Sequence, residues 1–218
     1  MIALIEVALI ILAGPLLTVA AFSRPDRRAL VGTRLACGES PLSIVWRLAR
    51  TALGRAAIVV GLASLALLLT ALMPRGPTVA TVVTTQVALL AVAAGLLGLG
   101  LCCSSLWPDV HDAVGVAYVV IALVMGSLLL AGPYIARTPD ATAVIQAVLV
   151  VNPVVAVASA FDFDVLRSET LYGLSPIGQR RFDYPAWYAL AGVYLAAAVV
   201  LLAGAIERVA GLRRDIIG

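Results

Sequence analysis

Apolar runs of membrane length constrain this chain more than any other feature of its sequence. A hydrocarbon core ~30 Å thick needs about 20 consecutive, mostly apolar residues in a helix. Five such runs occur in the chain: Ile2–Phe22, Ala56–Met73, Thr78–Leu106, Ala113–Ile135 and Tyr184–Ile206. Hydrophobic residues make up 62% of the sequence and charged residues 12%, whereas soluble domains have ~45–50% and ~25%. The sequence therefore predicts an all-α integral membrane protein with about five transmembrane helices.

The length of 218 residues predicts a single transmembrane domain, residues 1–218, with no room for a soluble catalytic domain. Walker A, GxSxG and HExxH patterns are absent from the sequence, so we expect no bound nucleotide and no catalytic residue. The three cysteines and the single histidine do not have the spacing of metal ligands, and we expect no metal site. A net charge of +3 gives no reason to expect nucleic acid as a partner.

A basic stretch, residues 24–55, lies between the first two apolar runs. It contains seven arginines, against only Asp26 and Glu39 as acidic residues. Cytoplasmic loops of membrane proteins carry an excess of basic residues. We therefore predict that this stretch faces the cytoplasm and that the first run has its N-terminus outside.

The basic stretch also has a helical pattern with an interruption. Gly38 is expected to end a helix that starts near Asp26, and Ser40-Pro41 is expected to start another, since Ser is a good N-cap and Pro is favoured at the first helical position. After this restart, one face carries Leu42, Val45, Ala49 and Leu53, and the opposite face carries Ser43, Arg47, Arg50 and Gly54. Two interpretations stay open: a helix lying on anionic lipid headgroups, or an elbow on which a soluble partner docks.

The apolar segment 141–160 is predicted to be re-entrant. If it crossed the membrane, the last run would end outside and leave Arg208, Arg213 and Arg214 there, against the charge rule. A segment that enters from outside and returns keeps the loop 161–183 outside and places the C-terminal arginines inside. The Asn152-Pro153 break gives such a pair of short helices, provided that protein covers the exposed backbone.

The order of these parts resembles the type 2 permeases of ABC transporters, the membrane subunits of many bacterial exporters. In that family a span leads into a cytoplasmic stretch similar to E-R-x-x-G-T-L-E-L-L-L-x-T-P-L-S. Here Gly32-Thr33 and Pro41-Leu42-Ser43 are the closest matches. The segment 98–106 resembles the family's L-G-L-L-x-S-A-L, and Asn152-Pro153 resembles its re-entrant segment before the last span. The likeness covers nearly the whole chain through the order of its motifs.

The resemblance implies a permease subunit in a bacterial cytoplasmic membrane that exports a substrate when a separate subunit hydrolyses ATP. ATP and magnesium would bind to that cytoplasmic subunit, and a second permease copy or homologue would complete the pathway. Membrane lipid is the remaining expected partner. The residues implied in partner docking lie in the coupling region 24–55: Arg34, Gly38, Glu39, Ser40, Pro41, Leu42, Ser43 and Arg47.

The chain departs from the family in two respects. Family members usually have six spans and a cytoplasmic N-terminal helix, whereas this chain starts at what resembles the second span. Arg34 also stands where the family commonly has an acidic residue. Two other functions remain open, a non-transporting membrane scaffold and an intramembrane lipid-modifying enzyme. The enzyme is disfavoured because, apart from Glu6 and Gln86, the predicted spans lack charged and amide side chains.

Overall fold

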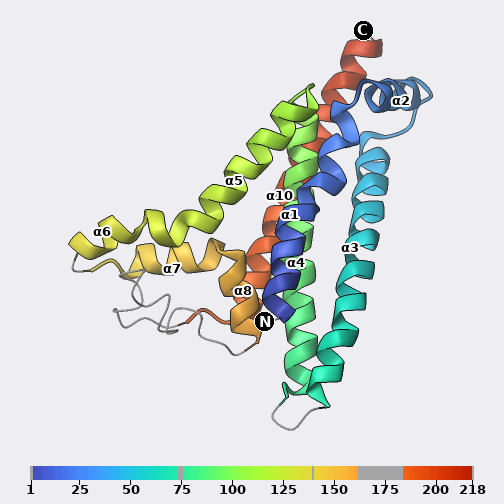
Figure 1. Ribbon diagram of the computed structural model, residues 1–218. Helices are drawn as coiled ribbons and strands as arrows, with labels where there is room; N and C mark the ends of the chain where they lie inside the picture. Colours follow the sequence, from blue (N-terminus) through green and yellow to red (C-terminus); the bar gives the residue numbers. More distant parts are fainter. Residues whose placement is uncertain (1, 73–75, 139, 162–183, 218) are drawn as a thin grey trace. The chain divides into compact units, whose positions relative to one another are not determined.

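The structure, a computed structural model, describes residues 2–72, 76–138, 140–161 and 184–217. In these ranges the chain is helical and contains no strand. The predicted outer loop 161–183 lies, apart from Phe161, outside the described residues. In chain order, the helices are α1 (Ile2–Ser23), α2 (Pro25–Ala36), α3 (Pro41–Ala71), α4 (Val79–Leu106), α5 (Val110–Leu130), α6 (Gly132–Arg137), α7 (Thr142–Val151), α8 (Pro153–Ala160) and α10 (Trp187–Ile217) (Figure 1).

Several of these helices are long and apolar enough to cross a membrane. Within the described ranges there are four such segments: Pro41–Ala71, Val79–Leu106, Val110–Arg137 and Trp187–Arg214. Two bent helix pairs raise the number to six if each counts as one span: α1 with α2, bent by 61°, and α7 with α8, bent by 84°. The prediction of an all-α, multi-pass membrane protein is therefore confirmed at the level of four to six candidate spans.

Two boundaries differ from the sequence prediction. The fourth apolar run is divided into α5 and α6, because Pro133 lies in the first turn of α6 and a proline cannot continue a helix without losing a backbone hydrogen bond. The coupling segment and the second run, predicted as separate helices, form the single 31-residue helix α3. Gly54 and Arg55 lie inside that helix and do not interrupt it.

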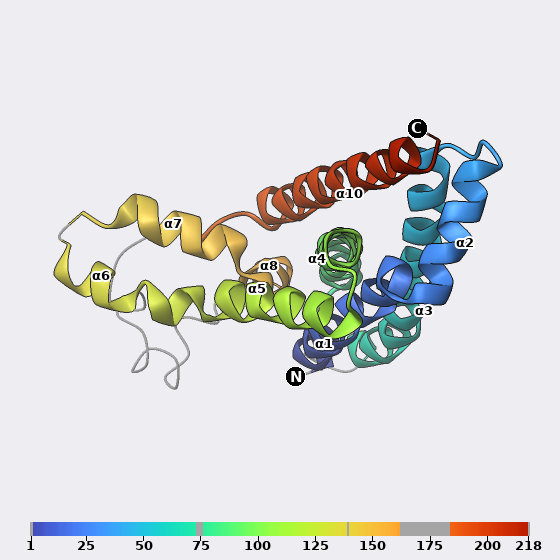
Figure 2. The ribbon, with the colours of Figure 1, turned by 90° about the horizontal axis from the view of Figure 1, so that it is seen from above.

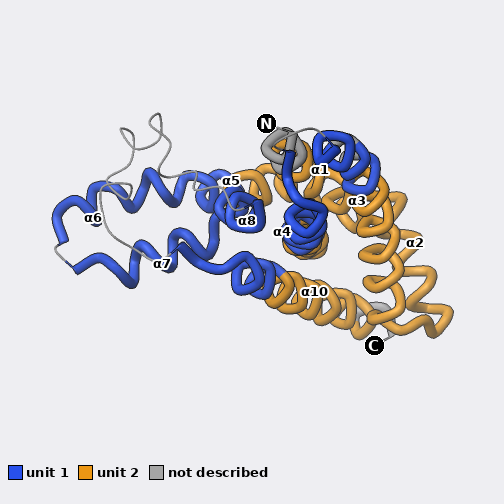
Figure 3. Tube along the Cα trace, turned by 90° about the horizontal axis from the view of Figure 1, so that it is seen from below, with its two compact units in different colours: residues 1–7, 60–92, 121–194 blue, residues 8–59, 93–120, 195–218 orange. Residues whose placement is uncertain are grey.

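The chain divides into two compact units, coloured separately in Figure 3. Unit 1 comprises residues 1–7, 60–92 and 121–194, and unit 2 comprises residues 8–59, 93–120 and 195–218. The coupling region 24–55 belongs to unit 2, and the Asn152-Pro153 break belongs to unit 1. Each unit is described by itself below.

The core of unit 2 joins the coupling region to three of the membrane-length helices. Phe22 of α1, Leu101 of α4 and Val209 of α10 pack in one buried cluster with Leu35 of α2 and Val45 of α3. Leu35 is fully buried, so α2 is anchored although most of its residues are polar or exposed. Burying each such side chain contributes roughly 1.5–3 kcal/mol.

A cluster of buried hydrogen bonds links the C-terminal end of α1 to the C-terminal end of α4 in unit 2. The Ser104 hydroxyl oxygen accepts hydrogen bonds from the Phe22 amide at 2.7 Å and from the Ser23 amide at 3.2 Å. The Ser23 hydroxyl in turn lies within hydrogen-bond distance of the Ser104 and Trp107 carbonyl oxygens. Buried hydroxyls need such partners, so the two helix ends are held at one register.

Two glycines of α4 allow close helix contacts in unit 2. A Cβ atom on Gly98 would lie 3.3 Å from the Cα atom of Ala198 in α10. A Cβ atom on Gly100 would lie 2.2 Å from the Thr18 hydroxyl and 2.8 Å from the Pro15 carbonyl of α1. Small residues at helix interfaces permit this approach in membranes.

Candidate partner-docking site

The turn between α2 and α3 is built around a left-handed residue. Gly38 has a φ of +86° and is the only glycine with positive φ in the described part of the chain. The amide of Glu39 donates to the Arg34 carbonyl at 3.0 Å, and the amide of Gly38 donates to the Leu35 carbonyl at 3.0 Å. These two bonds form a Schellman motif, which ends α2 as the sequence predicts.

The start of α3 is capped by Ser40. The Ser40 hydroxyl accepts a hydrogen bond from the Ser43 amide at 3.2 Å, and Pro41 occupies the first helical position. Both features were predicted from the Ser-Pro pair, because a serine cap satisfies a free amide and proline lacks one. Figures 1 and 2 show α2 and the beginning of α3 meeting at this turn.

Glu39 joins the two helices through its carboxylate. It forms an ion pair with Arg34 of α2 at 3.7 Å and a second ion pair with Arg47 of α3. The Ser43 hydroxyl donates to the same carboxylate at 3.2 Å. Exposed pairs of this kind each contribute only about 0–1 kcal/mol. Their effect is to orient Arg34 and Arg47 and to fix the direction in which α3 leaves the turn.

The apolar face of α3 differs from the predicted face. Ile44 and Val45 are buried in the core of unit 2, whereas Leu42 is 60% exposed and Trp46 is 58% exposed. Sequence spacing had grouped Leu42 with Val45. Leu42 and Trp46 are four residues apart and therefore share one side of the helix. This exposed pair, which we call the Leu42/Trp46 patch, includes a tryptophan that the sequence interpretation did not single out.

The eight predicted docking residues lie together in unit 2, within one helix end, one turn and one helix start. Arg34 closes α2, Gly38 to Ser40 form the turn, and Pro41 to Arg47 begin α3. Their mutual contacts build a defined surface feature with an apolar patch beside it. Arrangements of this kind, with an aromatic anchor near charged groups, suit a protein interface.

The predicted break in the segment 141–160 is held by Asn152 in unit 1. Its side chain is 1% exposed, and its oxygen accepts from the Val154 amide at 3.0 Å, which caps α8. The amide nitrogen donates to the carbonyls of Val124 and Met125 in α5, at 3.4 and 3.2 Å. Pro153 occupies the first position of α8, as the sequence predicts. One side chain thus caps a helix and ties the bend to α5.

The backbone groups around this bend also have partners in unit 1. The hydroxyl of Tyr194 in α10 donates to the Val151 carbonyl at the end of α7. The hydroxyl of Thr84 in α4 donates to the Ala160 carbonyl at the end of α8, at 3.1 Å. Irregular backbone at membrane depth requires such internal partners. Figure 1 shows α7 and α8 running in different directions on the two sides of the break.

The short turn before α5 is structural. The Asp109 carboxylate accepts from the His111 amide at 2.6 Å and from the Asp112 amide at 3.4 Å. Asp109 thus caps the N-terminus of α5.

No protein-family model, curated protein or solved structure matches the chain.

Gly38 provides a direct test of the turn. Replacing Gly38 with Ala should lower the free energy of unfolding by about 1–2 kcal/mol, since a Cβ atom disfavours the left-handed conformation. The matched control is Gly54→Ala, in the exposed helical part of α3, where alanine should stabilise by up to about 1 kcal/mol. Thermal unfolding in detergent measures both. Equal midpoints for the two variants would contradict the conformation assigned to Gly38.

Proposed function

We propose that the chain is the permease subunit of an ABC exporter in a bacterial cytoplasmic membrane and works with a separate ATP-binding subunit. The observation that carries this proposal is the construction of the α2–α3 turn. A lipid-surface helix needs neither a Schellman-terminated first helix nor a capped restart, whereas a docking elbow needs a fixed shape. The Leu42/Trp46 patch gives that elbow an exposed apolar contact.

In the proposed architecture, five helices span the membrane and α2 with the start of α3 forms the cytoplasmic coupling helix. The segments α7 and α8 form a re-entrant hairpin before the last span. The internal hydrogen bonds of Asn152, Tyr194 and Thr84 support the hairpin, because they satisfy the Val154 amide and two hairpin carbonyls that lipid would leave unpaired.

The proposed mechanism is alternating access. Closure of the ATP-binding subunits moves the elbow, and this movement acts on the membrane-spanning part of α3, which is continuous with the elbow. A second permease copy or homologue is required, because about five spans do not enclose a pathway. In this mechanism the ATP-binding subunit hydrolyses ATP, and the permease forms the path by which the substrate crosses the membrane.

Co-purification tests this proposal. When the chain is expressed with its gene neighbours and purified in detergent, we expect it to retain an ATP-binding subunit with ATPase activity. Purification without any ATP-binding protein, when no neighbouring gene encodes one, would contradict the permease function and favour a membrane scaffold.

Two variants of α3 sharpen this test. Leu42→Asp should weaken the binding of the ATP-binding subunit by roughly a few kcal/mol, because a groove of that subunit would bury an unpaired carboxylate. Arg50→Gln removes an exposed charge outside the patch and should cost about 0–1 kcal/mol. Loss of retention in Arg50→Gln, with Leu42→Asp unaffected, would identify the segment as an electrostatic lipid anchor.

A further inference from the structure

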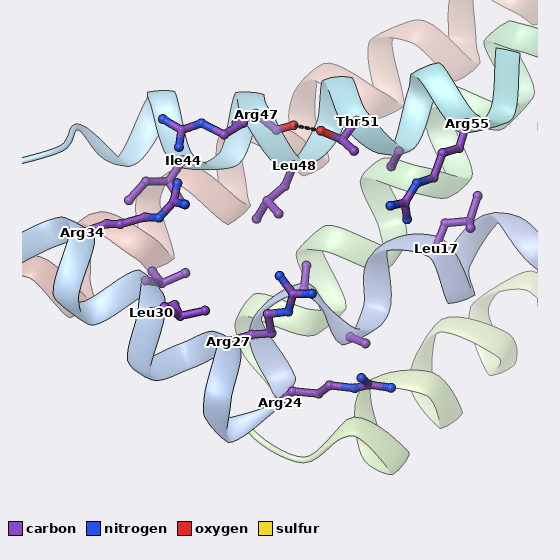
Figure 4. Close-up of a pocket in the computed structure, with 14 residues that line it drawn as sticks. Leu17, Arg24, Arg27, Leu30, Arg34, Ile44, Arg47, Leu48, Thr51 and Arg55 are labelled. Atoms are coloured by element: carbon purple, nitrogen blue, oxygen red, sulfur yellow. Dashed lines mark hydrogen bonds between the residues drawn. The ribbon is translucent and has the colours of Figure 1, made fainter. Parts of the chain in front are cut away.

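A cavity of about 420 Å³ in unit 2 shares only Arg34 and Arg47 with the eight predicted docking residues. It is lined by residues of α1, α2 and α3. Its volume falls within the range of small-molecule sites, ~300–1,000 Å³. Figure 4 shows it between the start of α3 and the segment that contains the end of α1 and α2.

The polar part of the cavity lining is strongly basic. Five arginines line it: Arg24, Arg27, Arg34, Arg47 and Arg55. No aspartate or glutamate is among the lining residues. In Figure 4, Arg27 and Arg55 extend from opposite sides toward the space between their helices. The cavity therefore concentrates positive charge and suits an anionic ligand.

Within the described residues, three of these arginines form no ion pair. Arg34 and Arg47 form ion pairs with Glu39. Among the described residues, no ion pair involves Arg24, Arg27 or Arg55. By comparison, a second cavity in unit 2, lined by Arg28, Arg208 and Arg214, contains Glu207 and is internally balanced in part. Arg24, Arg27 and Arg55 are thus the groups available to an external anion.

The rest of the lining is apolar. Val31, Ile44 and Ala52 are buried at its wall, with relative exposures of 3–6%. Leu17 and Ala20 come from α1, inside the first apolar run, and Arg55 directly precedes the second. The cavity therefore lies where two membrane-length runs meet the basic stretch. A free phosphate ion would leave this apolar wall in contact with water.

We propose that this cavity is a discrete binding site for an anionic phospholipid, with Arg24, Arg27 and Arg55 around the phosphate and the apolar wall beside the lipid's glycerol and acyl carbons. Basic pockets between membrane helices on the cytoplasmic side bind anionic headgroups in this way. The site goes beyond the proposed transport function and does not depend on it, since its residues need only the membrane location of the chain.

Lipid titration of the purified full chain tests the site. Delipidated protein in phosphatidylcholine micelles is titrated with phosphatidylglycerol, and bound lipid is counted by native mass spectrometry. We expect one phosphatidylglycerol per chain to bind more tightly than the rest. Arg27→Gln/Arg55→Gln should weaken that binding at least about tenfold, because each basic group near the headgroup contributes to affinity.

The matched control is Arg28→Gln/Arg50→Gln, which removes the same charge from the same two helices but not from this cavity. It should change the affinity less than about threefold. Equal losses in the two double variants would overturn the site in favour of general surface charge. Equal binding of phosphatidylcholine, or of inorganic phosphate at the same concentration, would overturn it as an anionic-lipid site.

If the variant Arg27→Gln/Arg55→Gln does not fold, a single substitution can be measured in its place. The single change Arg55→Gln should weaken phosphatidylglycerol binding about fivefold, with Arg50→Gln as its control. Unchanged binding by Arg55→Gln would overturn the proposal. Partner retention is a separate readout, so the lipid site and the docking function succeed or fail independently.

Discussion

Replacing Gly100 with Ala is expected to lower the free energy of unfolding by about 2–4 kcal/mol, which is large for the addition of one methyl group. The new Cβ atom would lie 2.2 Å from the Thr18 hydroxyl oxygen and 2.8 Å from the Pro15 carbonyl oxygen. Thr18 cannot simply rotate away, because its hydroxyl donates to the Leu97 carbonyl at 3.0 Å. The Pro15 oxygen is backbone, so α1 itself would have to move away from α4.

A second change separates these two contacts. Thr18→Ala added to Gly100→Ala removes the closer contact but leaves the one to Pro15, so it should recover only part of the lost stability. Gly115→Ala is the control, since a Cβ atom on this helical glycine meets nothing within 4 Å. Thermal unfolding in detergent ranks the variants. A Gly100→Ala midpoint equal to that of Gly115→Ala would show that α1 and α4 are not in close contact.

Asn152→Leu is expected to cost about 2–4 kcal/mol, although leucine has a similar size. The substitution leaves the part-buried Val154 amide without its cap and removes both bonds to the α5 carbonyls. Asn152→Ser keeps a cap acceptor but loses the amide donors, and should therefore cost about half as much. The readout is again thermal unfolding in detergent.

Thr142→Ala is the control for this series. Among the described residues, its exposed hydroxyl bonds only to the Asp140 carboxylate, so the change should stay within about 0.5 kcal/mol. A leucine variant as stable as the wild type would mean that Asn152 does not hold the bend between α7 and α8. Asn152→Ser as damaging as Asn152→Leu would assign the whole effect to the bonds with α5.

Local signals in the sequence predicted the coupling turn and the Asn152 break. A serine before a proline, a glycine after a helical stretch and an Asn-Pro pair each act through their own backbone, so no distant residue was needed to place them. The glycine contacts of α4 are different, because they involve partners in α1 and α10. These partners depend on which helices meet, and spacing along one helix does not contain that information.

Other features depend on packing and were missed. The apolar spacing of Leu42 and Val45 suggested one face, but the core of unit 2 buries Ile44 and Val45 and leaves Leu42 exposed with Trp46. The five-arginine cavity brings together residues up to 38 positions apart, from Leu17 to Arg55. Gly132-Pro133 interrupts the fourth predicted run, and a count of apolar residues alone does not show this break.

Photo-crosslinking from α3 tests the central claim most directly, namely that the α2–α3 turn docks a cytoplasmic ATP-binding subunit. A photoreactive phenylalanine analogue is placed at Leu42 and, as the control, at Leu62, which is on the same helix with a similar exposed fraction of 65% against 60%. Cells that express the chain with its gene neighbours are irradiated. We expect position 42, and not position 62, to form an adduct with an ATP-binding protein. Adducts with lipid alone at both positions would contradict the docking function.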